Sequence, residues 1–421
     1  MSAPSASTPV RRSSAQVKLE LVKRQGDPRD PALDGLRGCA ALMVVVVHCF
    51  LGPSQFAPGT GSAYVVRLLS PLWVGVELFF VLSGYLIVSL LLRAKASPGF
   101  FSDFYRRRFF RIGPLYALVL LIGAVMAEVM LVPGAASGWV DLLQNQYEGW
   151  MLLSLTHNFA LAAAGNWGVS GAWLSVTWSL CVEEHFYLLM PLLVWLLSVR
   201  AVRLLALAVV LASPLLRWLM LSFTDLPPLG AYVATPLHLD ALCAGTWLAC
   251  VAHHAQDWRL WRRRARRWSW LLGPLALLSW ALTAQFLPTA TGKFPLASAF
   301  GYFIPALLFA WVLLLALDPR SLRLKRLLSI APLRRLGTSA YGLYLFHLPV
   351  LWTLHLSLLG RSPSNTDAAG WLVSIAAIAL SISLAQFSWH LFEAPLVAWA
   401  RHSGRGGLQP EMTQPALTNA R

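Results

Sequence analysis

Residues 72–92 read LWVGVELFFVLSGYLIVSLLL, and Glu77 is the one charged side chain among them. About twenty apolar residues in a helix span the hydrocarbon core of a bilayer, so this stretch predicts a transmembrane helix. Similar runs recur along the 421-residue chain, which is 57% hydrophobic and only 12% Asp, Glu, Lys and Arg. Because soluble domains carry about 25% charged residues, the composition excludes a soluble globular enzyme, a disordered chain and a disulfide scaffold. We expect an all-α, polytopic helical membrane protein.

The length and spacing of the apolar runs predict about ten transmembrane helices. Their expected limits are 34–52, 72–92, 112–132, 172–198, 202–222, 234–252, 268–287, 297–317, 338–358 and 371–394. The long connection at 133–171 contains a semi-apolar stretch around 150–159, which is expected to lie at the interface or to form a short extra helix. Polar residues 1–30 and 398–421 are expected to be disordered cytoplasmic tails on either side of a membrane domain at 31–397.

The basic residues predict the orientation. With the N-terminus inside, all of the 34 Lys and Arg residues except Arg67, Arg217, Lys293 and Arg361 lie toward the cytoplasm. This asymmetry follows the positive-inside rule, and it places both termini in the cytoplasm. It also accounts for the net charge of +16 without a nucleic-acid partner. The five cysteines fall within apolar runs and lack metal-ligand spacing, so we expect no metal site.

Ionisable side chains within spans are costly, and each is therefore a candidate functional residue. Arg37 and His48 in the first span are eleven residues apart, which is three helical turns plus about 20°. Both therefore point to one helix face, about 16 Å apart along the axis. Arg37 can hold an anion and His48 can accept a proton. A snorkelling Arg and a core His bonded to a carbonyl group would show the same spacing.

Two further groups of charged residues stand out. Arg108 and Arg111 belong to a basic collar at 105–111, which suits phosphate recognition or an ordinary positive-inside anchor. The adjacent acids Glu183 and Glu184 differ by about 100° around the fourth span, so they serve two different neighbours. We expect one acid to pair with Arg37 or the collar and the other to set the tautomer of His48, with a structural ion pair as the alternative.

Six segments, taken in order, resemble the acyltransferase 3 family of integral-membrane O-acyltransferases, which includes O-antigen and exopolysaccharide acetylases. They are LDGLRG at 33–38 with the Arg37/His48 pair, GVELFFVLSGYLI at 75–87, Arg108-x-x-Arg111 before PLY at 114–116, WSLCVEEHFY at 178–187, SAYGLYLFHLP at 339–349 and FEAP at 392–395. Three positions depart from the family pattern: Glu77 replaces Asp, His185 replaces Gln, and His238 replaces the Arg that often precedes Asp240.

The resemblance implies an O-acyltransferase of a bacterial inner membrane. It would move an acyl group, most commonly acetyl from the co-substrate acetyl-CoA, to a hydroxyl of a carbohydrate or lipid-linked envelope acceptor, with no permanently bound cofactor. Residue by residue, it implies catalytic roles for His48, Glu184, Glu183 and Arg37, donor binding by Arg108, Arg111 and Arg37, and substrate binding by Glu77, Ser83 and Asp240. We expect His48 to act as a general base, although an acyl-histidine intermediate stays open.

A different class of function remains compatible with the same intramembrane charges. A proton-coupled carrier or exporter of an acylated or sugar-containing substrate would also need Arg, His and Glu side chains within its spans. It would move its substrate without changing it covalently. The expected phosphate-binding arginines favour the enzyme.

Overall fold

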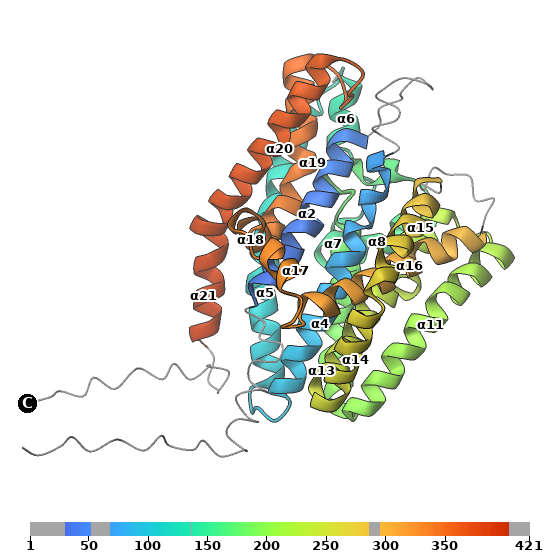
Figure 1. Cartoon of the computed structure of the whole chain (residues 1–421). Coiled ribbons are helices and arrows are strands. Elements are labelled where there is room, and N and C mark those ends of the chain that lie inside the picture. The colour runs from blue at the N-terminus through green and yellow to red at the C-terminus, as the bar shows by residue number, and fades with distance from the viewer. Residues whose placement is uncertain (1–29, 52–67, 135, 286–294, 404–421) are drawn as a thin grey trace, which may run out of the picture.

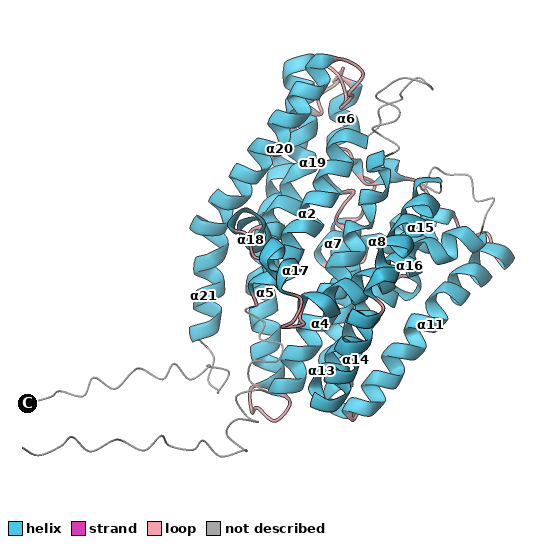
Figure 2. Ribbon diagram, viewed as in Figure 1, coloured by secondary structure: helices cyan, strands magenta, loops and turns pink. Residues whose placement is uncertain are grey.

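The computed structural model describes residues 30–51, 68–134, 136–285 and 295–403. Figure 2 shows that the elements in these ranges are helices joined by loops, and no strand occurs among them. The first half contains α2 (Pro31–Leu51), η1 (Ser70–Val74), α4 (Gly75–Ala94), α5 (Phe100–Met130), α6 (Ser137–Leu143), α7 (Gly149–Leu153), α8 (His157–Ala164), η2 (Trp167–Val169), α9 (Gly171–Leu174), α10 (Trp178–Leu196) and α11 (Val199–Phe223). The second half contains α12 (Pro228–Val233), η3 (Thr235–Leu237), α13 (Asp240–His253), α14 (Ala255–Arg267), η4 (Ser269–Leu271), α15 (Leu272–Gln285), α16 (Pro295–Ala316), α17 (Leu322–Leu328), α18 (Ala331–Thr338), α19 (Ala340–Leu359), α20 (Ala368–Ser388), η5 (Trp389–Glu393) and α21 (Ala394–His402).

The polytopic helical architecture is confirmed, although the number of long spans differs from the expected ten. Eight stretches in the described ranges are long and apolar enough to cross a bilayer: 31–50, 70–94, 100–130, 171–196, 199–223, 299–316, 340–359 and 368–401. The other two expected spans, 234–252 and 268–287, correspond to the 14-residue helices α13 and α15. The region before α13 is divided among α12, η3 and an irregular turn at His238 and Leu239.

The short helix α13 packs very closely against α4. A Cβ atom added to Gly84 would lie 1.9 Å from the backbone oxygen of Leu242, and one added to Gly245 would lie 2.1 Å from that of Val81. Only glycine permits such an approach of two helix backbones. Because protein surrounds α13, irregular backbone before it is shielded from lipid and can be satisfied by protein groups.

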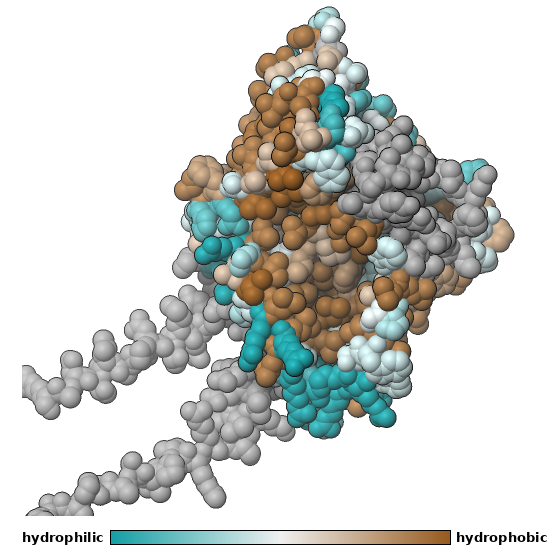
Figure 3. All heavy atoms as spheres, turned by 45° about the horizontal axis from the view of Figure 1, so that its top comes forward, coloured by the Kyte–Doolittle hydropathy of each residue, from teal (hydrophilic) through white to brown (hydrophobic). Residues whose placement is uncertain are grey.

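The outer helices present apolar side chains away from the helix bundle. On α5, Leu121, Val125 and Val129 are 61%, 55% and 62% exposed. Figure 3 shows a broad hydrophobic face with hydrophilic residues gathered at its lower edge. In water such a surface would be unstable, whereas lipid tails cover it at no cost.

Several segments expected to be loops are helical. Residues 253–267, which connect two expected spans and are rich in arginine, contain the whole of α14, and the collar arginines lie inside α5 rather than before the span. The semi-apolar stretch of the 133–171 connection, for which a short extra helix was one of the two expectations, lies in the short helices α7 and α8. Residues 398–402, expected in the C-terminal tail, belong to α21, while 1–29 and 404–421 lie outside the described residues. The cytoplasmic location of both termini stays a prediction.

Helix α2 lies between α19 and α4 (Figure 1). Its first turns pack directly on α17 and α18, because glycines line the contact on both sides. A Cβ added to Gly35 would lie 1.7 Å from the backbone oxygen of Leu328, and one added to Gly337 would lie 1.8 Å from that of Asp34. This packing fixes the helix that carries Arg37 and His48.

Candidate active site

Three arginines from two helices gather beside the first turns of α2. Arg37 of α2 and Arg108 and Arg111 of α5 lie within electrostatic range of one another. Arg37 donates to Asp34 at 3.3 Å, and its side chain stays 37% exposed. The Arg108 guanidinium lies 5.1 Å from the centre of the Tyr187 ring. A ring holds a guanidinium by its face, so the N–H edges of Arg108 remain available to an anion.

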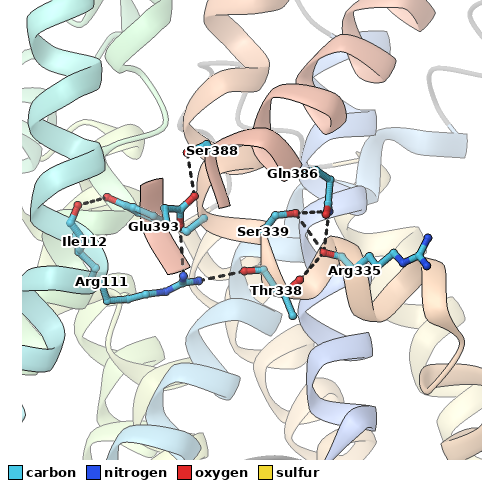
Figure 4. A network of polar contacts seen from close by, with 9 residues as sticks. Arg111, Ile112, Arg335, Thr338, Ser339, Gln386, Ser388 and Glu393 are labelled. Atoms are coloured by element: carbon cyan, nitrogen blue, oxygen red, sulfur yellow. Dashed lines mark hydrogen bonds and ion pairs between the residues drawn. The ribbon is translucent and has the colours of Figure 1, made fainter. Parts of the chain in front are cut away.

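Arg111 is anchored more firmly than the other two. Figure 4 shows its guanidinium reaching from α5 to Glu393 and to the backbone oxygen of Thr338, at 3.3 and 3.5 Å. It also stacks over Trp389, and Ser388 donates to the second oxygen of Glu393 at 3.2 Å. In the same figure Gln386 donates to Ser339 and to the backbone oxygen of Arg335, so α18, α19 and α20 are joined behind Arg111. Arg111 therefore ties α5 to the C-terminal helices as well as adding charge to the cluster.

The adjacent acids Glu183 and Glu184 of α10 point in directions about 100° apart around the helix, and their hydrogen bonds differ. Glu183 accepts hydrogen bonds from Ser83 at 2.6 Å and from Tyr187 at 3.2 Å, and it lies within electrostatic range of Arg108 and Arg37. Glu184 lies within range of Arg108, and one of its carboxylate oxygens is buried with no hydrogen-bond partner among the described residues. Both acids therefore face the arginine cluster. Ser83, expected to bind substrate, binds Glu183.

The hydrogen bond of His48 corrects the expectation that a glutamate sets its tautomer. Nδ1 of His48 lies 2.9 Å from Nε2 of His347 on α19, and the two ring planes differ by only 20° with their centres 5.1 Å apart. Nδ1 of His347 lies 3.2 Å from the backbone oxygen of Leu343. His48 is half-buried, whereas His347 is 0% exposed. The sequence places His347 within an apolar span, where any ionisable side chain is a candidate functional residue, but it predicts no role for this histidine.

Glu77 and Asp240, also expected to bind substrate, belong to a separate buried cluster. Oε1 of Glu77 lies 2.8 Å from Nε2 of His238, and Arg217 bonds both carboxylate oxygens of Asp240, at 2.7 and 3.2 Å. All four side chains are 0% exposed. Arg217 also donates to the backbone oxygens of Leu237 and Ala299. These contacts join α4, α11, α13 and α16, and they leave Asp240 no open oxygen for a substrate.

The 133–171 connection buries a histidine of its own. His157 at the start of α8 is 1% exposed, and its Nε2 lies 2.8 Å from the hydroxyl of Thr177. The thiol sulfur of Cys181 is 3.5 Å from the ring. Burial lowers the pKa of His157 to about 4, so the ring is neutral near pH 7 and secures the connection to the segment leading into α10.

Comparison with known proteins agrees with this arrangement. Residues 30–390 match the acyltransferase domain family, acyltransferase 3. The chain is 28% identical over 380 residues to the peptidoglycan O-acetyltransferase OatA of Listeria monocytogenes, covering 87% of this chain and 55% of that protein. It is 29% identical over 384 residues to the putative peptidoglycan O-acetyltransferase YrhL of Bacillus subtilis, covering 87% and 54%.

A third relative, the O-acetyltransferase OatA of Staphylococcus aureus, is 24% identical over 387 residues, which cover 87% of this chain and 57% of that protein. The chain thus matches a little over half of the length of these curated relatives. No solved structure matches it significantly. A family match that extends from the start of α2 to η5 includes the arginine cluster, the paired acids and both histidines, and this chain is therefore a member of the acyltransferase 3 family of membrane proteins.

Proposed function

We propose that this protein is a membrane O-acetyltransferase that moves an acetyl group from acetyl-CoA to a hydroxyl of an envelope sugar. One observation carries the proposal: Arg37 and His48 share one helix, so the arginine cluster that Arg37 forms with Arg108 and Arg111 of α5 provides an anion site at one end, and a base follows about 16 Å along the same helix face. The enzyme would reside in the inner membrane of a bacterium. Its donor would reach Arg37, Arg108 and Arg111 from the cytoplasmic side, as the basic residues predict.

The distance between the arginine cluster and His48 suggests how the donor would lie and how the acetyl group would be transferred. The arginines hold the phosphates of the donor, and its thin, neutral pantetheine arm carries the thioester toward His48. His48 removes the proton from the acceptor hydroxyl while the oxygen attacks the thioester carbonyl carbon. A new C–O bond forms, the C–S bond breaks, and the thiolate of CoA takes the proton back from His48. General-base assistance of this kind supplies about 10²–10⁴-fold in rate.

The activities for which the relatives are named guide the choice of acceptor. Two of them are peptidoglycan O-acetyltransferases, one of them named as putative, so we propose a peptidoglycan-type sugar, free or lipid-linked, as the first acceptor class to test. Other envelope polysaccharides offer the same hydroxyl group. The identity of the acyl group rests on the same names.

The test is transfer by purified protein in nanodiscs. Radiolabelled acetyl-CoA is added with envelope extract, and CoA release and label in the extract are both measured. We expect transfer by the wild type, a loss of at least 10²-fold in His48→Ala, and little change in His254→Ala, whose side chain is exposed at the end of α13. Transfer by His48→Ala at the wild-type rate would refute the role of His48. In sealed proteoliposomes of the same protein, a sugar that crosses the bilayer unmodified, without CoA release, would instead support the carrier.

A further inference from the structure

We propose that His347 is a positioning residue that fixes the tautomer of His48 and so makes Nε2 of His48 the basic nitrogen. This inference rests on the proposed function, because it specifies which atom of His48 accepts the proton. It assigns a role to a neutral, fully buried histidine from the opposite end of the chain.

The backbone carbonyl of Leu343 sets the direction of the hydrogen bonds. A carbonyl oxygen can only accept, so Nδ1 of His347, 3.2 Å away, carries the proton. In a neutral ring the other nitrogen is then an acceptor, so Nε2 of His347 accepts from Nδ1–H of His48 across 2.9 Å. The lone pair of His48 then lies on its remaining nitrogen, Nε2, for which the described residues supply no hydrogen-bond donor. One backbone oxygen thus specifies the protonation of two rings.

The opposite arrangement is unfavourable for a definite reason. If Nε2 of His347 carried the proton, its Nδ1 lone pair would face the lone pairs of the Leu343 oxygen at 3.2 Å. If His347 carried both protons, a full charge would be buried in a residue that is 0% exposed and has no carboxylate among its hydrogen-bond partners in the described part of the chain. His48 is half-buried, so its free nitrogen can meet a substrate.

The backbones on both sides of the pair are held in place. The amide of Asn365 donates to the backbone oxygen of Cys49, the residue after His48, at 2.8 Å. Ser374 of α20 in turn donates to Asn365 at 2.7 Å, and Ser374 lies 3.1 Å from Nε2 of His355 on α19. The end of α2 is therefore linked to the same helix that carries His347. A hydrogen bond between two rings needs this fixed separation.

Two substitutions at His347 separate positioning from packing. His347→Phe keeps a ring of similar size but removes the acceptor, whereas His347→Gln offers an amide oxygen at a similar reach from the backbone. We expect His347→Phe to lower kcat about 10–100-fold with KM for acetyl-CoA little changed, since loss of an orienting partner typically has this effect. His347→Gln should recover most of the rate. In the His48→Ala background, His347→Phe should cause no further loss.

A second readout does not depend on transfer. Nitrogen NMR of protein labelled with ¹⁵N-histidine, with His48 assigned by its loss in His48→Gln, reports which ring nitrogen carries the proton. We expect His48 protonated at Nδ1 in wild type and His347→Gln, and mixed tautomers in His347→Phe.

The outcomes distinguish this inference from the proposed function. An unchanged tautomer and rate in His347→Phe would overturn the positioning role while leaving His48 as base. Equal losses in the Phe and Gln variants with unaltered tautomers would also overturn it, because packing alone would then explain the loss. A shifted tautomer in His347→Phe with no transfer by the wild type would support the positioning role and refute the proposed function.

Discussion

Removing Arg217 should destabilise the protein far more than removing the whole ion pair of which it is part. In Arg217→Met, the carboxylate of Asp240 and the backbone oxygens of Leu237 and Ala299 lose their donors in a site that is 0% exposed. Breaking a buried pair by deleting one partner costs about 3–5 kcal/mol. In Arg217→Met/Asp240→Leu the unpaired charge is also gone, so the double variant should be more stable than the single one, although both backbone oxygens stay unbonded.

The assay is thermal unfolding followed by tryptophan fluorescence, in detergent and at matched protein concentration. At about 2 °C per kcal/mol for a large chain, the single variant should lose roughly 6–10 °C in Tm, and the double variant should recover at least half of that loss. Acetyl transfer by the folded fraction, measured well below Tm, should stay close to wild type because this cluster is separate from His48. A single variant as stable as wild type, or a double variant no better than the single, would refute the argument that the pair is structural.

Three further predictions use other parts of the molecule. Gly84→Leu should abolish monodisperse folded protein, because even its Cβ would lie 1.9 Å from a backbone oxygen of α13, whereas Gly273→Ala, with nothing within 4 Å, should purify normally; equal yields by size-exclusion chromatography would contradict this packing. Arg108→Ala should raise KM for acetyl-CoA about tenfold or more. The control Arg106→Ala removes the same charge from α5, but Arg106 is paired with Asp103, so this variant should change KM little. A larger rise of KM in Arg106→Ala than in Arg108→Ala would reject the donor site. The pKa of His157 is about 4 when folded and about 6.5 when unfolded, so its contribution to the free energy of unfolding is complete above pH 6.5 and is lost as the pH falls toward 4. The wild type should therefore lose at most roughly 3 kcal/mol of stability through this group over that range, and His157→Gln should lose less. Identical denaturation profiles for the two proteins would count against this prediction.

The sequence predicts the fold well wherever a helix faces lipid. Long apolar runs such as 72–92 have no other stable environment, and eight of the ten expected spans lie on helices of sufficient length. The prediction fails at 234–252 because hydropathy cannot tell a span from a short helix enclosed by protein. Pro236 and the polar residues His238 and Asp240 shorten that helix, and Arg217 from α11 bonds the buried backbone oxygen of Leu237 and the carboxylate of Asp240.

For the candidate site, the sequence predicts what one helix determines alone. The shared face of Arg37 and His48 follows from helical periodicity, whereas Glu183 and Glu184, expected to serve different neighbours, both lie within electrostatic range of Arg108. Contacts between helices do not follow from periodicity, so a glutamate was expected as the hydrogen-bond partner of His48, whereas the structure places His347 there. Nor could spacing show that Asp240 is enclosed by Arg217. Which side chains meet depends on how the bundle packs, and glycine contacts such as Gly35 with Leu328 decide that packing.

The sequence separation of 299 residues from His48 to His347 also has a consequence for biosynthesis. Helix α2 leaves the ribosome first, and at about 5–20 residues per second roughly 15–60 s pass before α19 is made. Throughout that interval the nascent chain holds His48 in the membrane without the ring that orients it. Arg111 is likewise without its partner Glu393 in this interval, because Glu393 is translated after His347. A ribosome-stalled chain would thus contain most of the charged residues of the site and yet have no oriented base, so the onset of acetyl transfer should coincide with insertion of the last spans.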